Sequence, residues 1–299
     1  MASLNPVFTN LNGDSSWLIS LPWPTGGYFH LLLDPWLGGP AIITSSWLSH
    51  ITHVEQEKFQ TIAQVEQLAR DISGPRDSEG HIDAVIVSHP FSDHTHKDTL
   101  IQLASTVPVY AACEAAAVVR SWNHFDTVVD IPDYAPTTPW REEDLAPLPS
   151  WLHLLRIPTG EPHPALHFGI VLALASRNER REAIIYSPHG IEPQFLQPLV
   201  DEESFATLAL LHGIDDQSTL GVPQLGVENG LRLEALTGAR YWLRTHNPRL
   251  NFRGLIGWFY RSVPRTLDEG LNQAERETGT KRARPNYVEV ANGESVVLE

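Results

Sequence analysis

Cysteine is almost absent from this sequence, since Cys113 is the only one among 299 residues. A single cysteine cannot form an intrachain disulfide, and it excludes a zinc finger built on cysteine ligands. We interpret Cys113 as a small buried apolar side chain, because free cysteine usually behaves in that way.

Basic residues are also scarce, with 21 lysines and arginines against 36 acidic residues and a formal net charge of −15. This balance disfavours nucleic acid and anionic membrane surfaces as partners, because both attract clustered positive charge. The sequence has no apolar run of about 18 residues, the length that a transmembrane helix requires. Its first residues lack the basic start and apolar core of a signal peptide, and we therefore expect a soluble, cytoplasmic protein.

Three common catalytic signatures are missing. There is no Gly-x-Ser-x-Gly nucleophile elbow, no glycine-rich phosphate loop with its lysine, and no Gly-x-Gly-x-x-Gly dinucleotide motif. The sequence therefore gives no indication of a serine hydrolase, a P-loop nucleotide-binding protein or a Rossmann dehydrogenase.

The sequence does show short apolar strands that alternate with helical segments. This order predicts an α/β fold, and we expect one domain over residues 1–299. The predicted helices are 55–71, 98–104, 113–122 and 230–237. A polar stretch follows at 266–285, and the Asn292-Gly293 pair predicts a C-terminal β-hairpin over 287–298.

The segment 87–97 carries the densest group of potential metal ligands: His89, Asp93, His94 and His96. The apolar run 82–87 precedes it and predicts a buried strand. Ligands at the end of a strand are held rigidly and stay accessible to substrate. Imidazole and carboxylate groups together suit zinc and similar metals.

The same pattern, a short apolar strand followed by a histidine, recurs at His189 and His246. A catalytic zinc site needs about three protein ligands and one position for water. We therefore expect Asp93, His94, His189 and His246 to meet around one ion.

The segment 89–94 resembles the His-x-His-x-Asp-His motif of metallo-β-lactamase-fold hydrolases. The hairpin that ends in 34–37 resembles the lactonase branch of that superfamily. Further short motifs are similar to those of fungal members, and they lie at 93–100, 186–190, 211–213 and 242–246. The resemblance extends over about residues 12–260.

This resemblance implies an αββα sandwich with metals at one edge, between its two sheets. Members usually hold two ions, but this chain departs from their pattern twice. Phe91 replaces the second histidine of the motif, and His189 stands where a bridging aspartate is usual. We therefore expect one Zn²⁺, with iron or manganese as alternatives, and fewer negative charges to hold a second cation.

Several positions keep two interpretations. The third histidine motif of the superfamily falls in the loop 158–167, where His163 or His167 would be the ligand; we place His163 in the metal set. His89 is either a ligand or a hydrogen-bonding remnant. Asp34 either forms a turn or orients a ligand histidine. The roles of two other histidines stay open, those of His96 and His212.

The resulting hypothesis is a metal-dependent hydrolase for an ester, lactone or thioester of a small metabolite. A metal-bound hydroxide would attack the carbonyl group, and Asp93 would bind the metal and orient the water. A lyase, isomerase or cyclase of secondary metabolism is the first alternative, because the site lacks a full two-metal set. A non-catalytic binding relative of the fold is the second, favoured by Phe91. The sequence determines neither the substrate nor the oligomeric state.

Overall fold

The computed structural model describes residues 5–74, 80–136, 145–160, 162–174, 181–202 and 205–299. Its contacts divide the chain into two compact units. Unit 1 comprises Met1–Asp130, Pro248–Leu255 and Val290–Glu299, and unit 2 comprises Ile131–Asn247 and Ile256–Glu289. The prediction of a single domain over 1–299 stays a prediction.

Unit 1 is built on a mixed sheet with the strand order β19-β1-β2-β3-β6-β7-β8 among its described residues. The pairs from β19 to β3 are antiparallel, and those from β3 to β8 are parallel. The strands are β1 (Val7–Asn10), β2 (Trp17–Pro22), β3 (Tyr28–Leu33), β6 (Ala84–Val87), β7 (Val109–Ala111), β8 (Val128–Asp130) and β19 (Ser295–Val297).

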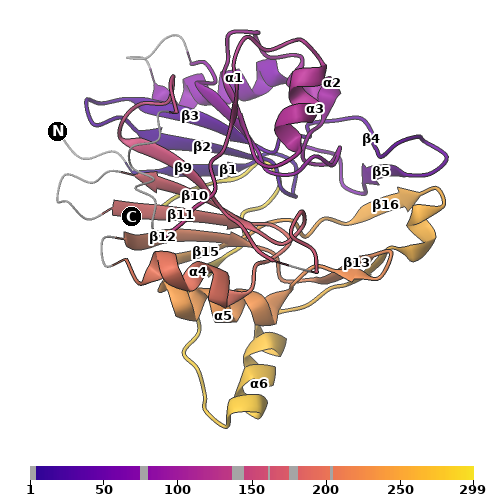
Figure 1. Ribbon diagram of the computed structural model, residues 1–299, viewed down its shortest axis with the longest axis vertical. Coiled ribbons are helices and arrows are strands. Elements are labelled where there is room, and N and C mark those ends of the chain that lie inside the picture. The colour runs from indigo at the N-terminus through magenta and orange to yellow at the C-terminus, as the bar shows by residue number, and fades with distance from the viewer. Residues whose placement is uncertain (1–4, 75–79, 137–144, 161, 175–180, 203–204) are drawn as a thin grey trace. The chain divides into compact units, whose positions relative to one another are not determined.

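Two helices of unit 1 cover one face of this sheet (Figure 1). They are α1 (Ile62–Ser73) and α3 (Ala115–Ser121), and the short α2 (Lys97–Leu100) follows the histidine cluster. Val65 of α1 and Val119 of α3 pack in one cluster with Leu32 and Val85 of the sheet. The alternate strand residues Leu31 and Ile86 are fully buried as well, and a strand buried on both faces reads as a continuous apolar run.

A small sheet of unit 1 has the order β16-β5-β4. Its strands are β4 (Ala41–Ile42), β5 (His50–His53) and β16 (Leu250–Arg253). Trp36, Ala41 and Ile51 form its buried cluster, against which Phe252 packs.

Unit 2 is built on a sheet with the order β18-β15-β12-β11-β10-β9 among its described residues. The strands are β9 (Leu152–Ile157), β10 (Gly169–Leu174), β11 (Arg181–Ser187), β12 (Phe205–His212), β15 (Tyr241–Arg244) and β18 (Tyr287–Val288). The pairs β11–β12, β12–β15 and β15–β18 are parallel, so β11, β12 and β15 end at the same edge.

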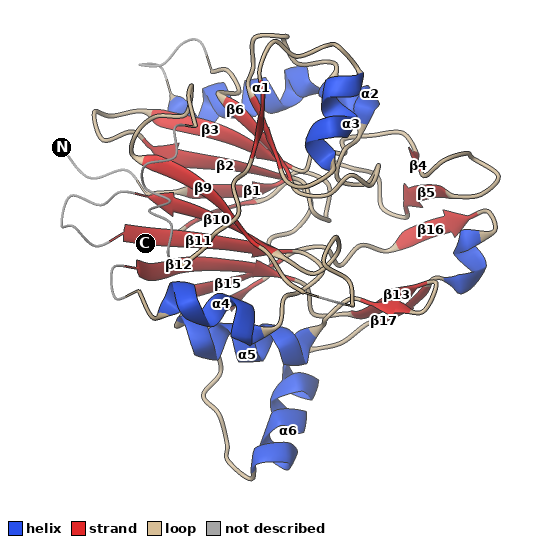
Figure 2. Ribbon diagram, viewed as in Figure 1, coloured by secondary structure: helices blue, strands red, loops and turns tan. Residues whose placement is uncertain are grey.

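Helices α4 (Pro193–Val200) and α5 (Val227–Thr237) lie along the strands of unit 2, and α6 (Leu267–Thr278) packs on α5 (Figure 2). A second small sheet has the order β14-β13-β17. It consists of β13 (Asp216–Thr219), β14 (Val222–Pro223) and β17 (Arg261–Val263), and the 3₁₀ helix η2 (Ile256–Phe259) precedes β17. Among the described residues, no helix is both long enough and apolar enough to cross a bilayer.

The C-terminal hairpin expected over 287–298 is wrong. β18 pairs with β15 in the sheet of unit 2, whereas β19 pairs with β1 in the sheet of unit 1. Asn292 and Gly293 do form a turn, but Gly293 N donates to Asn10 O, and Asn292 Oδ1 accepts from Lys58 N. Each strand extends the edge of a larger sheet, whereas an isolated two-stranded hairpin is marginally stable at best.

Candidate functional site

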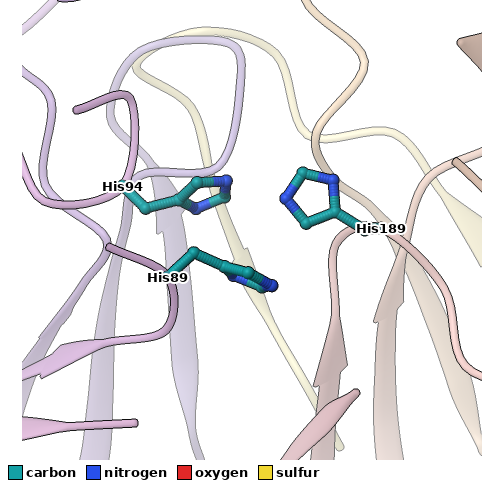
Figure 3. A group of neighbouring side chains, drawn as sticks. All are labelled: His89, His94 and His189. Carbon is teal, nitrogen blue, oxygen red and sulfur yellow. The ribbon is translucent and has the colours of Figure 1, made fainter. Parts of the chain in front are cut away.

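The histidine cluster of unit 1 begins where β6 ends. His94 N and Thr95 N both donate to Phe91 O, at 2.9 and 2.7 Å, and Thr95 Oγ1 donates to His89 O. This tight turn returns the chain on itself, so the ring centroids of His89 and His94 lie 4.9 Å apart (Figure 3). The predicted strand end therefore does bring two candidate ligands together.

Asp34 lies beneath this turn, directly after β3, with a positive φ of 43°. Its carboxylate accepts from Ser88 N at 2.7 Å, from Ser88 Oγ, and from His94 Nδ1 at 2.7 Å. Asp34, Ser88 and His94 are all fully buried. The bond to Asp34 fixes the orientation of the His94 ring, as a carboxylate commonly does for a metal-ligating histidine. The structure thus supports the orienting interpretation of Asp34.

The charge around His94 is strongly negative. Burial by itself disfavours the imidazolium form, but Asp34 and Asp93 outweigh it and raise the pKa of His94 to about 9. Asp93 Oδ2 lies 3.8 Å from His94 Nε2, on the side of the ring opposite Asp34. A cation at Nε2 would replace the proton and would meet the carboxylate of Asp93.

Asp93 supplies the most direct test of whether this cluster fits a metal. Its Oδ1 atom is buried and has no hydrogen-bond partner among the described residues. A buried carboxylate oxygen without a donor is costly, and binding a cation is one way to compensate it. The residues of unit 1 therefore fit a divalent metal in both donor type and local charge.

His96 is held for a structural purpose. Its Nδ1 lies 2.9 Å from Thr99 Oγ1 and its Nε2 lies 3.4 Å from Pro40 O. Burial lowers its pKa, which keeps the ring neutral. Because both ring nitrogens face protein oxygens, His96 fastens the start of α2 to the loop before β4 and is not placed as a ligand.

Unit 2 contributes two histidines at the shared edge of its parallel strands. His189 (Figure 3) follows β11 and His246 follows β15, and their ring centroids lie 4.6 Å apart at 84°. Gly190, at φ 88°, allows this turn, because a Cβ there would lie 2.4 Å from Leu225 Cβ. The structure therefore brings these two candidate ligands together, while their role as ligands stays a prediction.

His246 adopts a left-handed backbone conformation, with φ 53°. For an L-residue this conformation costs about 1–2 kcal/mol. Strained backbone of this kind concentrates at functional sites, where the surrounding structure must hold it.

His212 also lies at this edge, but it serves the scaffold. Its Nε2 lies 2.8 Å from Asn229 Oδ1, and its Nδ1 lies 2.5 Å from Gly213 O. Asn229 in turn bonds both the backbone N and O of Ile191. Burial lowers the pKa of His212, so the ring stays neutral and links α5 to the strand end.

The histidines of the loop between β9 and β10 face one another. The rings of His163 and His167 lie 5.8 Å apart, and His167 Nε2 lies 2.8 Å from Pro223 O. Among the described contacts, His163 meets His167 rather than the His189–His246 pair. Its assignment as a ligand stays a prediction.

Sequence reasoning missed the polar residues that support the histidines. Ser88, Asn229 and Gln217 each bond a candidate ligand or its turn. Only Ser88 carried a local signal, since it stands between the apolar strand and His89.

Comparisons with known proteins place this geometry in context. No family model and no curated protein matches the sequence. Solved structures do match over 98–99 % of this chain. A possible metal-dependent hydrolase from Veillonella parvula has a TM-score of 0.58 at 11 % identity, with 100 % of that chain covered. An isothiocyanate hydrolase from Delia radicum gut bacteria has a TM-score of 0.59 at 16 % identity, with 99 % covered.

A third match is CmlA, a diiron β-hydroxylase from Streptomyces venezuelae, with a TM-score of 0.57 at 12 % identity and 54 % of that chain covered. At these identities the likeness bears on the fold and not on the reaction. It extends over nearly the whole chain and confirms the predicted fold class, an α/β fold of the αββα metallo-β-lactamase type.

Proposed function

We propose that this protein is a metal-dependent hydrolase of the metallo-β-lactamase superfamily, in its lactonase-like branch. The proposed ligands of one ion are Asp93 and His94 of unit 1 and His189 and His246 of unit 2. His89 and His163 are further candidate ligands. Zinc is the proposed metal, and iron or manganese are alternatives that the same nitrogen and oxygen donors would accept.

One observation carries this proposal. A fully buried carboxylate, Asp34, orients the ring of His94, and Asp93 holds a buried oxygen without a hydrogen-bond donor beside the same ring. An imidazole oriented by a carboxylate, next to an acceptor that lacks a donor, is what a cation needs and what a purely structural cluster avoids.

The chain's own residues would then divide the chemistry among them. A divalent ion in such a site activates water and polarises a carbonyl group. With an ion in place of the Nε2 proton, Asp34 would keep the remaining proton of His94 on Nδ1 and so leave Nε2 to bind. Asp93 would help to hold the ion and would orient the attacking water. The substrate class that this suits is an ester, lactone or thioester of a small metabolite.

Two features favour one ion over two. Phe91, in place of a histidine, stacks on His89 with the ring centroids 6.2 Å apart and the planes at 15°. His89 Nδ1 lies 2.7 Å from Ser88 Oγ. His189 stands where a carboxylate is usual, and a neutral ring attracts a second cation less strongly.

Two of the matched structures support a hydrolytic reaction: one is an isothiocyanate hydrolase, and the other is a possible metal-dependent hydrolase. The third is a diiron hydroxylase, so a metal-assisted reaction that does not add water is the second candidate. Product mass distinguishes the two, since hydrolysis adds one water. A non-catalytic binding relative would hold no metal. A cytoplasmic location and a small-molecule partner stay predictions from the sequence.

The test is metal content and turnover of purified variants. Asp93→Ala and His94→Ala should each lose at least about 100-fold in zinc affinity, because each removes a ligand that the remaining donors cannot replace. Hydrolysis of a panel of esters, lactones and thioesters should fall with the metal. His81→Ala is the matched control, because the side chain of this histidine is 60 % exposed and its ion pair within the described part of the chain is with Asp83. Full metal content and turnover in Asp93→Ala would refute the proposal.

A further inference from the structure

His246 needs a neighbour that stabilises its left-handed backbone, with φ 53°. Three hydrogen bonds anchor the turn around it. Thr245 N donates to His212 O at 3.4 Å, Ile214 N donates to Asn247 Oδ1 at 2.8 Å, and Gln217 Nε2 donates to His246 O at 3.3 Å. The first two bonds hold the residues on either side, whereas the bond from Gln217 reaches His246 itself.

The side-chain amide of Gln217 is oriented with its NH₂ group toward the carbonyl oxygen of His246. Gln217 lies on β13, is only 4 % exposed, and pairs with Ser262 of β17. Its Nε2 donates to His246 O at 3.3 Å, and its Oε1 accepts from the hydroxyl of Tyr260 at 3.2 Å. Since a carbonyl oxygen can only accept, the bond to His246 O fixes which end of the amide points at His246, and the hydroxyl of Tyr260 holds the other end in place.

The hairpin that carries Gln217 also reaches the ring of His246. Gln224 N donates to Gln217 O at 2.8 Å, and Gln224 Nε2 lies 3.5 Å from His246 Nε2. The second distance is at the limit of a hydrogen bond. The carbonyl bond from Gln217 is therefore the contact that can hold the backbone of His246 whether or not the ring nitrogen is engaged.

We propose that Gln217 is a positioning residue for His246, and that Tyr260 supports it by holding the Oε1 end of its amide in place. The backbone of His246 is in the left-handed conformation, and a change in its φ would move the imidazole ring away from His189. The bond from Gln217 holds the peptide that follows His246, and the bond from Thr245 N to His212 O holds the segment before it, so together they keep the backbone conformation of His246 and the direction of its ring. This role rests on the proposed function, in which His246 is a metal ligand.

The test is zinc affinity of the full chain, measured by competition with a chromophoric chelator, together with the visible spectrum of the Co²⁺-loaded protein. Gln217→Met keeps the volume of the side chain and removes the amide. It should weaken zinc affinity about 10–100-fold, which is the usual effect of removing a hydrogen-bond partner of a metal ligand. It should also change the Co²⁺ ligand-field bands. Tyr260→Phe removes only the hydroxyl and should weaken affinity less, in the same direction.

Two controls separate positioning from stability. Leu231→Ala leaves a cavity in the core of unit 2 and should lower the melting temperature with zinc affinity and the Co²⁺ spectrum unchanged. Trp258→Ala removes a side chain that is 82 % exposed on η2, two residues before Tyr260, and should change neither. If Gln217→Met is too unstable to purify, Tyr260→Phe carries the test.

The outcomes separate this inference from the proposed function. If Gln217→Met and Tyr260→Phe bind zinc with the wild-type affinity and spectrum, while His246→Ala loses zinc, the positioning role of Gln217 is overturned and the proposed function is not. Zinc binding that survives unchanged in His246→Ala overturns the proposed ligand set first. Weakened binding in Gln217→Met, with the two controls intact, supports the inference.

Discussion

Asp34 illustrates how one residue can organise a site without touching substrate. Its carboxylate accepts three hydrogen bonds, two from Ser88 and one from His94, in a fully buried position. Its charge keeps a proton on His94 Nδ1 and contributes to the raised pKa of that ring. The charge therefore orients the His94 ring and, in the proposed function, would partly compensate a bound cation.

Asp34→Asn should separate these effects. The amide keeps the shape but removes the charge, and its NH₂ group must face a donor, either Ser88 or His94. The pKa of His94 should then fall below its value of about 9, which by itself leaves fewer protons to compete with zinc at pH 7.5. The loss of the orienting charge should outweigh this effect and lower zinc affinity about 10–100-fold. Asp98→Asn is the control, because it makes the same change of charge on the exposed face of α2. Equal zinc affinity in both variants would contradict the orienting role.

The sequence predicted the ligand candidates better than their supports. Asp93 and His94 stood out because four potential ligands followed one buried strand. The supporting role of Gln217 could not be predicted, because its hydrogen bond to His246 spans 29 residues. That bond also depends on the positive φ of His246, which no sequence pattern indicates. Asp34 was recognisable only as a turn or an orienting residue, since both roles place an aspartate before a proline.

At the scale of elements, helix ends were harder to predict than helices. The apolar spacing of 55–71 predicted a helix, but α1 begins at Ile62, because Thr61 forms a capping box with Gln64. Helix α6 lies within a stretch that was interpreted only as polar. Its signals were the same capping box at Thr266 and a left-handed Gly279 at its end, rather than apolar periodicity.

The small sheet of unit 1 is fastened by a buried ion cluster. His53 of β5 bonds Glu57 through Nδ1 at 2.6 Å and Asp14 through Nε2 at 3.3 Å, and its ring lies 4.0 Å from that of Trp36. Burial opposes the charged form, but the two carboxylates outweigh it and raise the pKa of His53 to about 9. The ring can donate to both carboxylates, and so join β5 and Glu57 to the turn between β1 and β2, only while His53 is protonated.

Stability should consequently fall as the solution becomes alkaline. A group whose pKa is raised by folding contributes fully below its unfolded pKa of 6.5, and loses that contribution as pH rises through about 9. The free energy of unfolding of the wild type, relative to His53→Gln, should decline by about 3 kcal/mol over this window, at about 1.4 kcal/mol per pKa unit. Urea unfolding of both proteins from pH 6 to pH 10, with a chelator present, measures it. Parallel pH profiles for the two proteins would contradict the role of His53.

At the scale of the whole molecule, alternating strands and helices were enough to predict the α/β class. The division into two units was not predictable, because late segments return to early ones. β16 pairs with β5 and β19 pairs with β1, each across about 200 residues or more of sequence. Such pairings depend on long-range contacts, which local patterns do not encode. Each unit nonetheless has its own buried core.

If one ion takes ligands from both units, metal binding must behave as a single event. His94→Ala in unit 1 and His246→Ala in unit 2 should each abolish the rise in melting temperature that zinc causes in the wild type. The double variant should bind no less zinc than either single variant, since the shared ion is already lost. The wild type should bind about one zinc per chain by elemental analysis. Should each unit hold its own ion instead, each single variant would keep half of the bound zinc, and only the double variant would lose it all.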